Sequence, residues 1–243
     1  MSAVGTLLRV VDQPSRAMGE VTERPRLWLL AAALIVVVSM AMLWFTAPLQ
    51  IVRANEAQAQ VIERMTANMP ADQARLVRES AKDMTLSRYL LTTGLVGAAM
   101  AALGWVVRGA VVHFSSMALG GHSQWPATYA VCLWAMLPYA VRDLLLTVYT
   151  LVTQKVPEHA GLGFLVASGD LLQDSRSLQY ALLSNLDPFV LWHLLLLAVG
   201  IAVATKMGRA KAAILAIVVF TVFMAFKIVP VALSAAVMGN LGG

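Results

Sequence analysis

Five long apolar segments constrain the fold of this chain more than any other feature. They are residues 27–49, 89–107, 125–141, 188–205 and 212–233, and the third could continue toward residue 152. Each approaches the roughly 20 residues that an α-helix needs to cross the hydrocarbon core of a bilayer. Because lipid offers the backbone no hydrogen-bond partners, all are predicted to be helices. The expected fold class is therefore all-α, a polytopic membrane protein with five transmembrane helices.

The composition favours the same class. Of the 243 residues, 59% are hydrophobic and 13% are charged, whereas roughly a quarter of a soluble domain is charged. The first apolar segment is too long for a cleaved signal peptide and follows a polar stretch, so we expect it to stay as a membrane helix. The single cysteine, Cys132, excludes a disulfide within the chain.

The basic residues indicate the orientation. Three parts of the chain carry eight basic and three acidic residues together: residues 1–26, the predicted second loop with Arg108, and the short turn at 206–211. The segment 142–187 carries three basic and five acidic residues. The first loop, 47–88, is nearly balanced. Since short loops rich in lysine and arginine remain in the cytoplasm, we predict a cytoplasmic N-terminus and a C-terminus outside. This placement accounts for the net charge of +5, and we expect no nucleic-acid partner.

Two segments beside the spans are amphipathic. Residues 1–26 are predicted to form a cytoplasmic segment of two short helices on the inner membrane surface, and 27–243 is the five-helix membrane domain. Within that domain, the outer loop 47–88 has apolar residues at helical spacing, with a break expected near Pro70. Two interpretations of this loop remain open: a hairpin lying on the bilayer or on the protein's own helices, and a docking surface for a partner.

Sequence motifs of catalysis are missing. The chain contains no HExxH, GxSxG or GxxxxGK[ST] pattern, and its histidines are scattered. His193 has no second histidine at i+3 or i+4, so we expect it to pack in the membrane domain rather than bind a metal. The sequence predicts no enzymatic activity, no cofactor and no metal site.

One polar cluster is expected near the outer edge of the membrane. Arg142 and Asp143 follow Pro138 in the third apolar segment, and Lys227 precedes Pro230 in the fifth. Both prolines are predicted to kink their helices. The structural interpretation pairs Asp143 with Lys227, or with Arg142 as the local alternative. The functional interpretation makes the cluster a polar site for a ligand or proton in an outer-leaflet cavity.

Small residues mark two further features. Gly120 and Gly121 permit a tight turn before the third segment. Gly97 and Ala101 have the small-xxx-small spacing that lets membrane helices approach closely.

Several of these elements together resemble the Yip family, the Ypt-interacting proteins. They are the Gly120-Gly121 pair followed by an aromatic-rich helix with Leu137-Pro138-Tyr139, the run LDPFVLWHLLLLAVGIAVATKMGRAK, and the N-terminal PSRAMGEVTERP. The resemblance covers nearly the whole chain. It implies a five-helix bundle with a cytosolic N-terminus.

The resemblance also suggests a function. Eukaryotic family members bind small GTPases, but the long charged first loop looks more like that of bacterial members, which are associated with ABC-type exporters. We therefore expect a non-catalytic accessory or scaffold protein of a bacterial inner membrane, whose partners are the lipid bilayer and another membrane protein, such as an ABC exporter. The alternative is a small transporter or channel with a polar site at Arg142, Asp143 and Lys227. The sequence does not indicate the oligomeric state.

Overall fold

The computed structural model describes residues 3–241, and in that range every regular element is helical. Five of its helices are long and apolar enough to cross a membrane, namely Pro25–Thr66, Leu86–Ala118, Trp125–Thr153, Pro188–Thr205 and Arg209–Leu233. The prediction of an all-α polytopic membrane protein with five spans is thereby confirmed.

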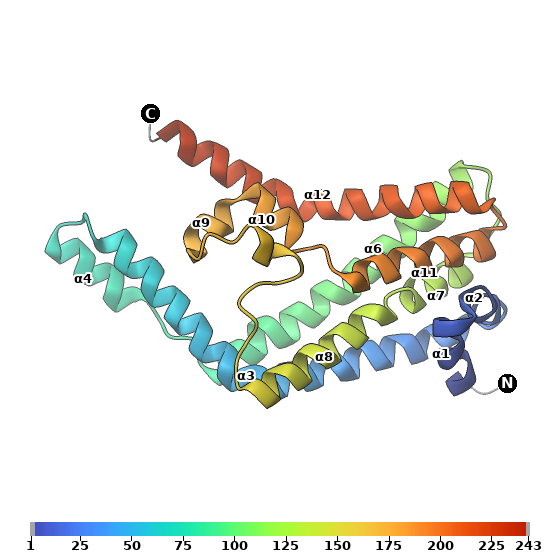
Figure 1. The fold of residues 1–243 in the computed structure, drawn as a ribbon, viewed down its shortest axis with the longest axis horizontal. Coiled ribbons are helices and arrows are strands. Elements are labelled where there is room, and N and C mark those ends of the chain that lie inside the picture. The colour runs from blue at the N-terminus through green and yellow to red at the C-terminus, as the bar shows by residue number, and fades with distance from the viewer. Residues whose placement is uncertain (1–2, 242–243) are drawn as a thin grey trace.

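The helices form one elongated bundle (Figure 1). The spans contain η1 (Pro25–Leu27) and α3 (Trp28–Thr66), then α5 (Leu86–Tyr89), η2 (Leu90–Val96) and α6 (Gly97–Ala118), then α7 (Trp125–Trp134) and α8 (Leu137–Thr153), then α11 (Pro188–Thr205), and finally α12 (Arg209–Leu241). The shorter helices are α1 (Ala3–Asp12), α2 (Pro14–Glu23), α4 (Ala71–Ser80), η3 (Gly163–Leu165), α9 (Leu171–Arg176) and α10 (Leu178–Leu183).

The bundle has two different ends, which we name after helices that lie there. At the α2 end lie α1, α2, the 119–124 loop and the 206–208 turn (Figure 1). At the α10 end lie α9, α10 and the last residues of α8. The N-terminus is at the α2 end and the C-terminus extends from the opposite one, as an odd number of spans requires.

Two spans are longer than their apolar segments. Residue 49 lies inside α3, which continues through Pro48 to Thr66, because the following residues, rich in Ala, Gln, Glu and Arg, are good helix formers. The second span ends at Ala118, so Arg108 lies inside α6 and not in a loop as we predicted. The single charge interrupts the apolar pattern but not the helix, which continues for ten more residues.

The glycine pair ends α6 as a helix cap. Gly120 has φ +85°, and the backbone amides of Gly121 and Gly120 bond to the carbonyls of Ser116 and Met117 at 2.9 and 3.0 Å. This is the Schellman pattern, in which a left-handed glycine satisfies the last carbonyls. The next amide, of His122, bonds to the Thr205 carbonyl at 2.9 Å and so ties the loop to the end of α11.

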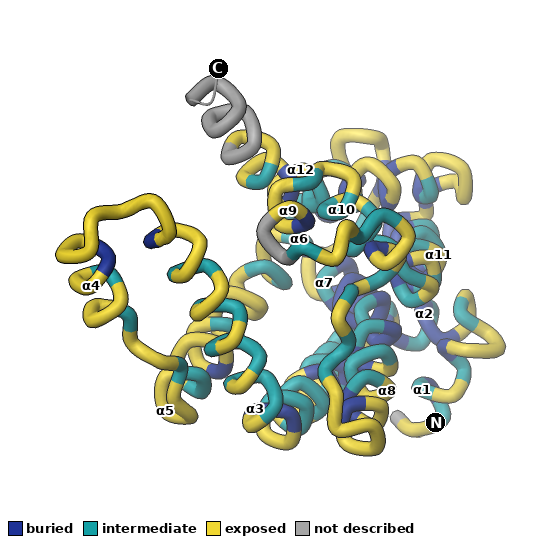
Figure 2. Tube along the Cα trace, turned by 60° about the vertical axis from the view of Figure 1, so that its left-hand side comes forward, coloured by how far each residue is buried: buried dark blue, intermediate teal, exposed yellow. Residues whose placement is uncertain are grey.

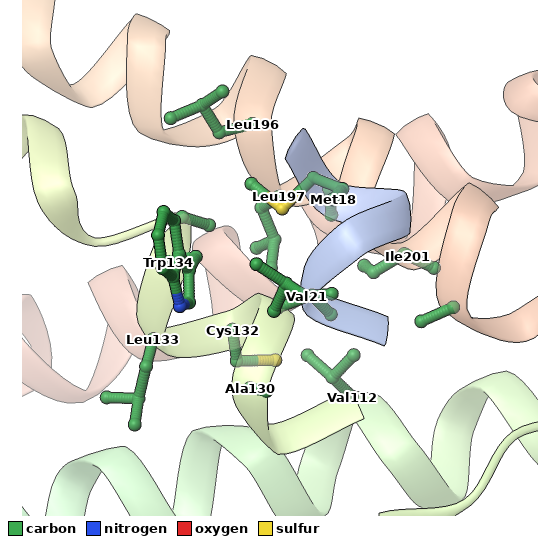
Figure 3. Packing of buried hydrophobic residues seen from close by; sticks show 14 of the residues in the cluster. Met18, Val21, Val112, Ala130, Cys132, Leu133, Trp134, Leu196, Leu197 and Ile201 are labelled. Atoms are coloured by element: carbon green, nitrogen blue, oxygen red, sulfur yellow. The ribbon is translucent and has the colours of Figure 1, made fainter. Parts of the chain in front are cut away.

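The best-packed part of the molecule surrounds α2, α7 and α11 at the α2 end. Trp134, Leu197 and Met18 are fully buried there, and Figure 3 shows them converging from three elements. The Trp134 indole donates a hydrogen bond to the Leu27 carbonyl at 3.0 Å, so its polar edge is satisfied as well. Because α2 contributes to this core, it packs onto one end of the bundle. The place of residues 1–26 at the inner membrane surface stays a prediction.

The end of α3 and α4 form a helical hairpin that projects from the bundle (Figures 1 and 2). The helix break falls at residues 67–70, next to Pro70. Two arginines of α3 hold the hairpin to the loops at the α10 end. Arg53 donates to the carbonyls of Pro157 and Glu158, the latter at 2.9 Å, and Arg64 pairs with Asp170 at 2.6 Å.

Candidate functional site

The third span is broken into two helices, and the break creates a polar site inside the bundle. α7 ends at Trp134 and α8 begins at Leu137, so the break lies at the residues that precede Pro138. The amide of Tyr139 bonds to Met136 at 3.0 Å and not to Ala135. The Ala135 carbonyl is therefore free to accept a bond from another element, and Nδ1 of His193 contacts it at 2.6 Å.

His193 is fixed in one tautomer by its two partners. A carbonyl oxygen can only accept, so Nδ1 carries the hydrogen that reaches Ala135. Nη1 of Arg108 lies 3.4 Å from Nε2 and can only donate, so Nε2 offers its lone pair. The ring is 1% exposed and lies 4.8 Å from the Tyr139 ring. This histidine is therefore a packed, neutral side chain that links α6, α8 and α11.

Arg108 has no carboxylate partner within the described residues. Besides His193, its guanidinium contacts the Phe223 ring, with 5.0 Å between Cζ and the ring centroid. A charged side chain in a membrane helix is costly and generally faces a polar or aromatic partner. These contacts give α6 a polar attachment to α11 and α12 at the middle of the span.

A second polar group surrounds Arg142. Its Nε and Nη2 each donate to Oδ1 of Asp143 at 3.1 Å, and its Nη1 donates to Oδ2 of Asp187 at 3.3 Å. Oδ1 of Asp187 accepts the Val190 amide at 2.8 Å and so caps α11. Arg142 also stacks on Tyr139, with Cζ 5.1 Å from the ring centroid. One guanidinium thus joins α8 to the start of α11.

Lys227 does not complete the expected pair. Its Nζ donates to Oδ1 of Asn185 at 3.2 Å, and Asp143 pairs with Arg142. The predicted pairing of Asp143 with Lys227 is therefore wrong, and the local alternative is the one observed. Asp143 and Lys227 lie at similar distances from the start of their predicted segments, which indicates a similar depth but not the direction in which each side chain points.

The two prolines differ in effect. Pro138 is next to a complete break in the third span. Pro230 lies within the continuous helix α12, which changes direction along its length toward the C-terminus in Figure 1. An internal proline removes one backbone hydrogen bond and is the usual cause of such a bend.

A cavity of about 370 Å³ lies between α3 and the η2–α6 helix. Its wall on the α6 side is made of small residues, including Gly94, Gly97 and Ala101, and its one charged lining residue is Asp143 from α8. Four of the lining residues carry a hydroxyl group, namely Ser39, Thr46, Tyr89 and Thr93. The polar cluster predicted from the sequence thus contributes one of its three members to a cavity.

Sequence reasoning missed Arg108, Asp187 and Ala135 as parts of this network. A signal existed for Asp187, because the Asp187-Pro188 pair has the form of a helix N-cap followed by proline at the first helical position. Ala135 contributes only its backbone, so its side chain carried no signal. Within residues 3–241, no group of three or more His, Cys, Asp or Glu side chains is placed to hold a metal.

Comparison with known proteins adds one finding. The family model described as the Yip1 domain matches residues 8–229, which includes all of the elements described above except parts of α1 and α12. Neither the curated proteins nor the solved structures gave a match.

Proposed function

The chain belongs to the Yip1-domain family of membrane proteins, and from this premise we propose that it is a non-catalytic accessory or scaffold subunit that docks another membrane protein. The partner we propose is an ABC-type export or efflux complex, as the resemblance to bacterial family members suggests. The matching cellular location is a bacterial inner membrane, with the N-terminus in the cytoplasm.

The observation that carries this proposal is the α3–α4 hairpin, which we define as residues 51–80. It exposes large apolar side chains although it lies outside the packed bundle: Met65 is 56% and Leu76 is 66% exposed. Exposed apolar residues on a projecting element are typical of interaction surfaces.

The hairpin is also held in a defined position, which lowers the entropic cost of binding a partner. The side chain of Asn55 makes two hydrogen bonds to the backbone of Met84. Its Nδ2 donates to the Met84 carbonyl at 3.2 Å, and its Oδ1 accepts from the Met84 backbone amide at 2.7 Å. Arg78 reaches Thr66 at 3.2 Å across the hairpin. Together with the Arg64–Asp170 pair, these contacts favour a docking surface over a hairpin that lies on the lipid.

Copurification in mild detergent tests the proposal. We expect mass spectrometry to find an ABC-type membrane complex with the native chain, and to lose it for Leu76→Glu, which places a charge at an exposed apolar position of the hairpin. The matched control is Leu165→Glu, an exposed leucine at the same end of the bundle but outside the hairpin. Equal recovery from both variants, or the absence of any membrane partner, would contradict the proposal.

A further inference from the structure

The cavity between α3 and α6 is not needed for a docking role, and close packing of the bundle would have removed it. Its volume of about 370 Å³ lies within the roughly 300–1,000 Å³ that small-molecule sites occupy. It is lined mainly by residues 35–50 and 89–105, which belong to two candidate membrane spans.

The backbone itself produces the cavity. The η2–α6 helix lies close to α3 at Gly94. A Cβ atom added to this glycine would lie only 3.0 Å from the Leu43 side chain of α3. One turn further, at Gly97, an added Cβ would meet nothing within 4 Å. The two helices therefore separate from this point, since α3 packs along α8 while α6 packs along α7. The segment η2 at the rim is a π-helix, a form found frequently at functional sites.

The charge of the cavity comes from Asp143. Arg142 is shared by two carboxylates, those of Asp143 and Asp187, so one positive and two negative groups leave this triad with a net charge of −1. Both bonds from Arg142 reach Oδ1 of Asp143. Among the side chains that the structure describes, none donates a hydrogen bond to its Oδ2. Negative charge at this depth is costly unless a cation neutralises it.

The side chains of Arg108 and Lys227 contact groups other than Asp143. Arg108 contacts His193 and Phe223, and Lys227 contacts Asn185. Neither residue lines the cavity. Asp143 therefore gives the cavity wall its only formal charge, and a ligand that is complementary to this wall is apolar along its length and positively charged at one position.

We propose that the cavity binds a single amphiphilic organic cation. Its ammonium group lies at Oδ2 of Asp143, and its apolar part lies between α3 and the small residues of α6. The lining hydroxyls, such as that of Ser39, offer further acceptors to a protonated amine. This site would make the protein a binder of amphiphilic cations in addition to its proposed docking role.

Equilibrium binding of dodecylammonium to the protein in phosphatidylcholine nanodiscs tests the proposal. We expect saturable binding, with no comparable binding of dodecanol or dodecyl sulfate. Asp143→Asn should weaken dodecylammonium binding at least ten-fold. Gly97→Leu should have a similar effect by filling the cavity. Gly104→Leu is the matched control, because Gly104 is on the same helix and also has open space around it, but does not line the cavity.

Several results would overturn this inference. Equal binding by the native chain and Asp143→Asn, or equal binding of dodecyl sulfate, would show that charge does not select the ligand. If Asp143→Asn fails to fold, the comparison of Gly97→Leu with Gly104→Leu decides, and equal binding by these two rejects the cavity. Disulfide cross-linking between copies through Ala101→Cys in native membranes would show that a second chain covers this face instead.

Discussion

Single residues hold the membrane helices of this protein together by polar contacts in three places. His193 joins α11 to the broken third span, Arg108 joins α6 to α11 and α12, and Arg142 joins α8 to the N-cap of α11. Each contact uses a donor whose partner comes from a different helix. Such bonds fix the rotation of helices for which lipid provides no hydrophobic driving force.

The Arg142 triad should behave as a coupled unit. Arg142→Met leaves two carboxylates without their shared cation, and we expect it to lower the thermal stability more than Asp143→Asn does. The loss should lie between about 1 kcal/mol, as for exposed pairs, and about 3 kcal/mol, as for buried ones, since these side chains are partly exposed.

Double-mutant cycles separate the two pairing schemes. Combining Arg142→Met with Asp143→Asn should cost less than the sum of the single changes, whereas Asp143→Asn and Lys227→Met should be additive. Measured coupling between Asp143 and Lys227 would contradict the observed contacts.

Glu20 makes the contact between α1 and α2 dependent on pH. The Thr6 hydroxyl donates to its carboxylate at 2.8 Å, and Arg9 pairs with it. The hydrogen bond from Thr6, helped by the charge of Arg9, lowers the pKa of Glu20 below its ordinary value of 4.5. A lowered pKa stabilises the folded form above the ordinary value, and this contribution is lost as the pH falls through the folded pKa.

We therefore expect the protection of the α1 amides from hydrogen exchange, measured relative to the intrinsic rate at each pH, to fall below about pH 4.5. Glu20→Gln should exchange faster at neutral pH and lose this pH dependence. An α1 segment that stays equally protected at low pH in the native chain would argue against a role for Glu20.

At the scale of elements, the sequence predicted both boundaries of the fourth span correctly. For the first and second spans it placed the C-terminal boundary too early. Asp187-Pro188 and the basic turn beginning at Lys206 mark the start and end of α11 by capping and charge. The first and second spans had no such signals at residues 49 and 107, where only the composition changes. Hydropathy identifies the part of a helix that lies in lipid, but helices continue where the residues permit it, as α3 and α6 do.

The candidate site was less predictable than the fold. The sequence identified Arg142 and Asp143 as unusual, but the partner of Arg142 at Asp187 and the partner of His193 at Ala135 depend on how α8 and α11 pack. The cavity depends on a divergence of α3 and α6 that begins at Gly97. The small-xxx-small spacing of Gly97 and Ala101 predicted a helix face that another helix can approach closely, and the structure leaves open space beside Gly97.

The close packing at Gly121, in the cap of α6, predicts that a larger residue there lowers the stability of the protein. An added Cβ would lie 2.9 Å from the Ser116 carbonyl and 3.0 Å from Met207, so Gly121→Ala should shift the loop and cost about 1–3 kcal/mol, as overpacking does. Gly104→Ala, in open space on α6, the helix that this cap ends, should be nearly neutral. Thermal unfolding in detergent measures both, and equal stability of the two variants would reject the close contact.

At the scale of the whole molecule, an odd number of spans places the two ends of a chain on opposite sides of a membrane, and we predict from the basic residues that the α2 end is the cytoplasmic one. Cys132 is buried, so an introduced cysteine is the only reactive one. In intact cells, a reagent that cannot cross the membrane should label Ala160→Cys at the α10 end and not Ala210→Cys at the α2 end. The reverse pattern would show that the orientation is inverted.

Photo-cross-linking in cells tests the docking role of the α3–α4 hairpin most directly. A photoreactive amino acid at position 76 replaces Leu76, which is 66% exposed on α4, and the control replaces Met100, which is 62% exposed on α6. Our account predicts a discrete adduct between position 76 and a second membrane protein, and no protein adduct from position 100. Adducts with lipid alone at position 76 would place the hairpin on the bilayer and contradict the account.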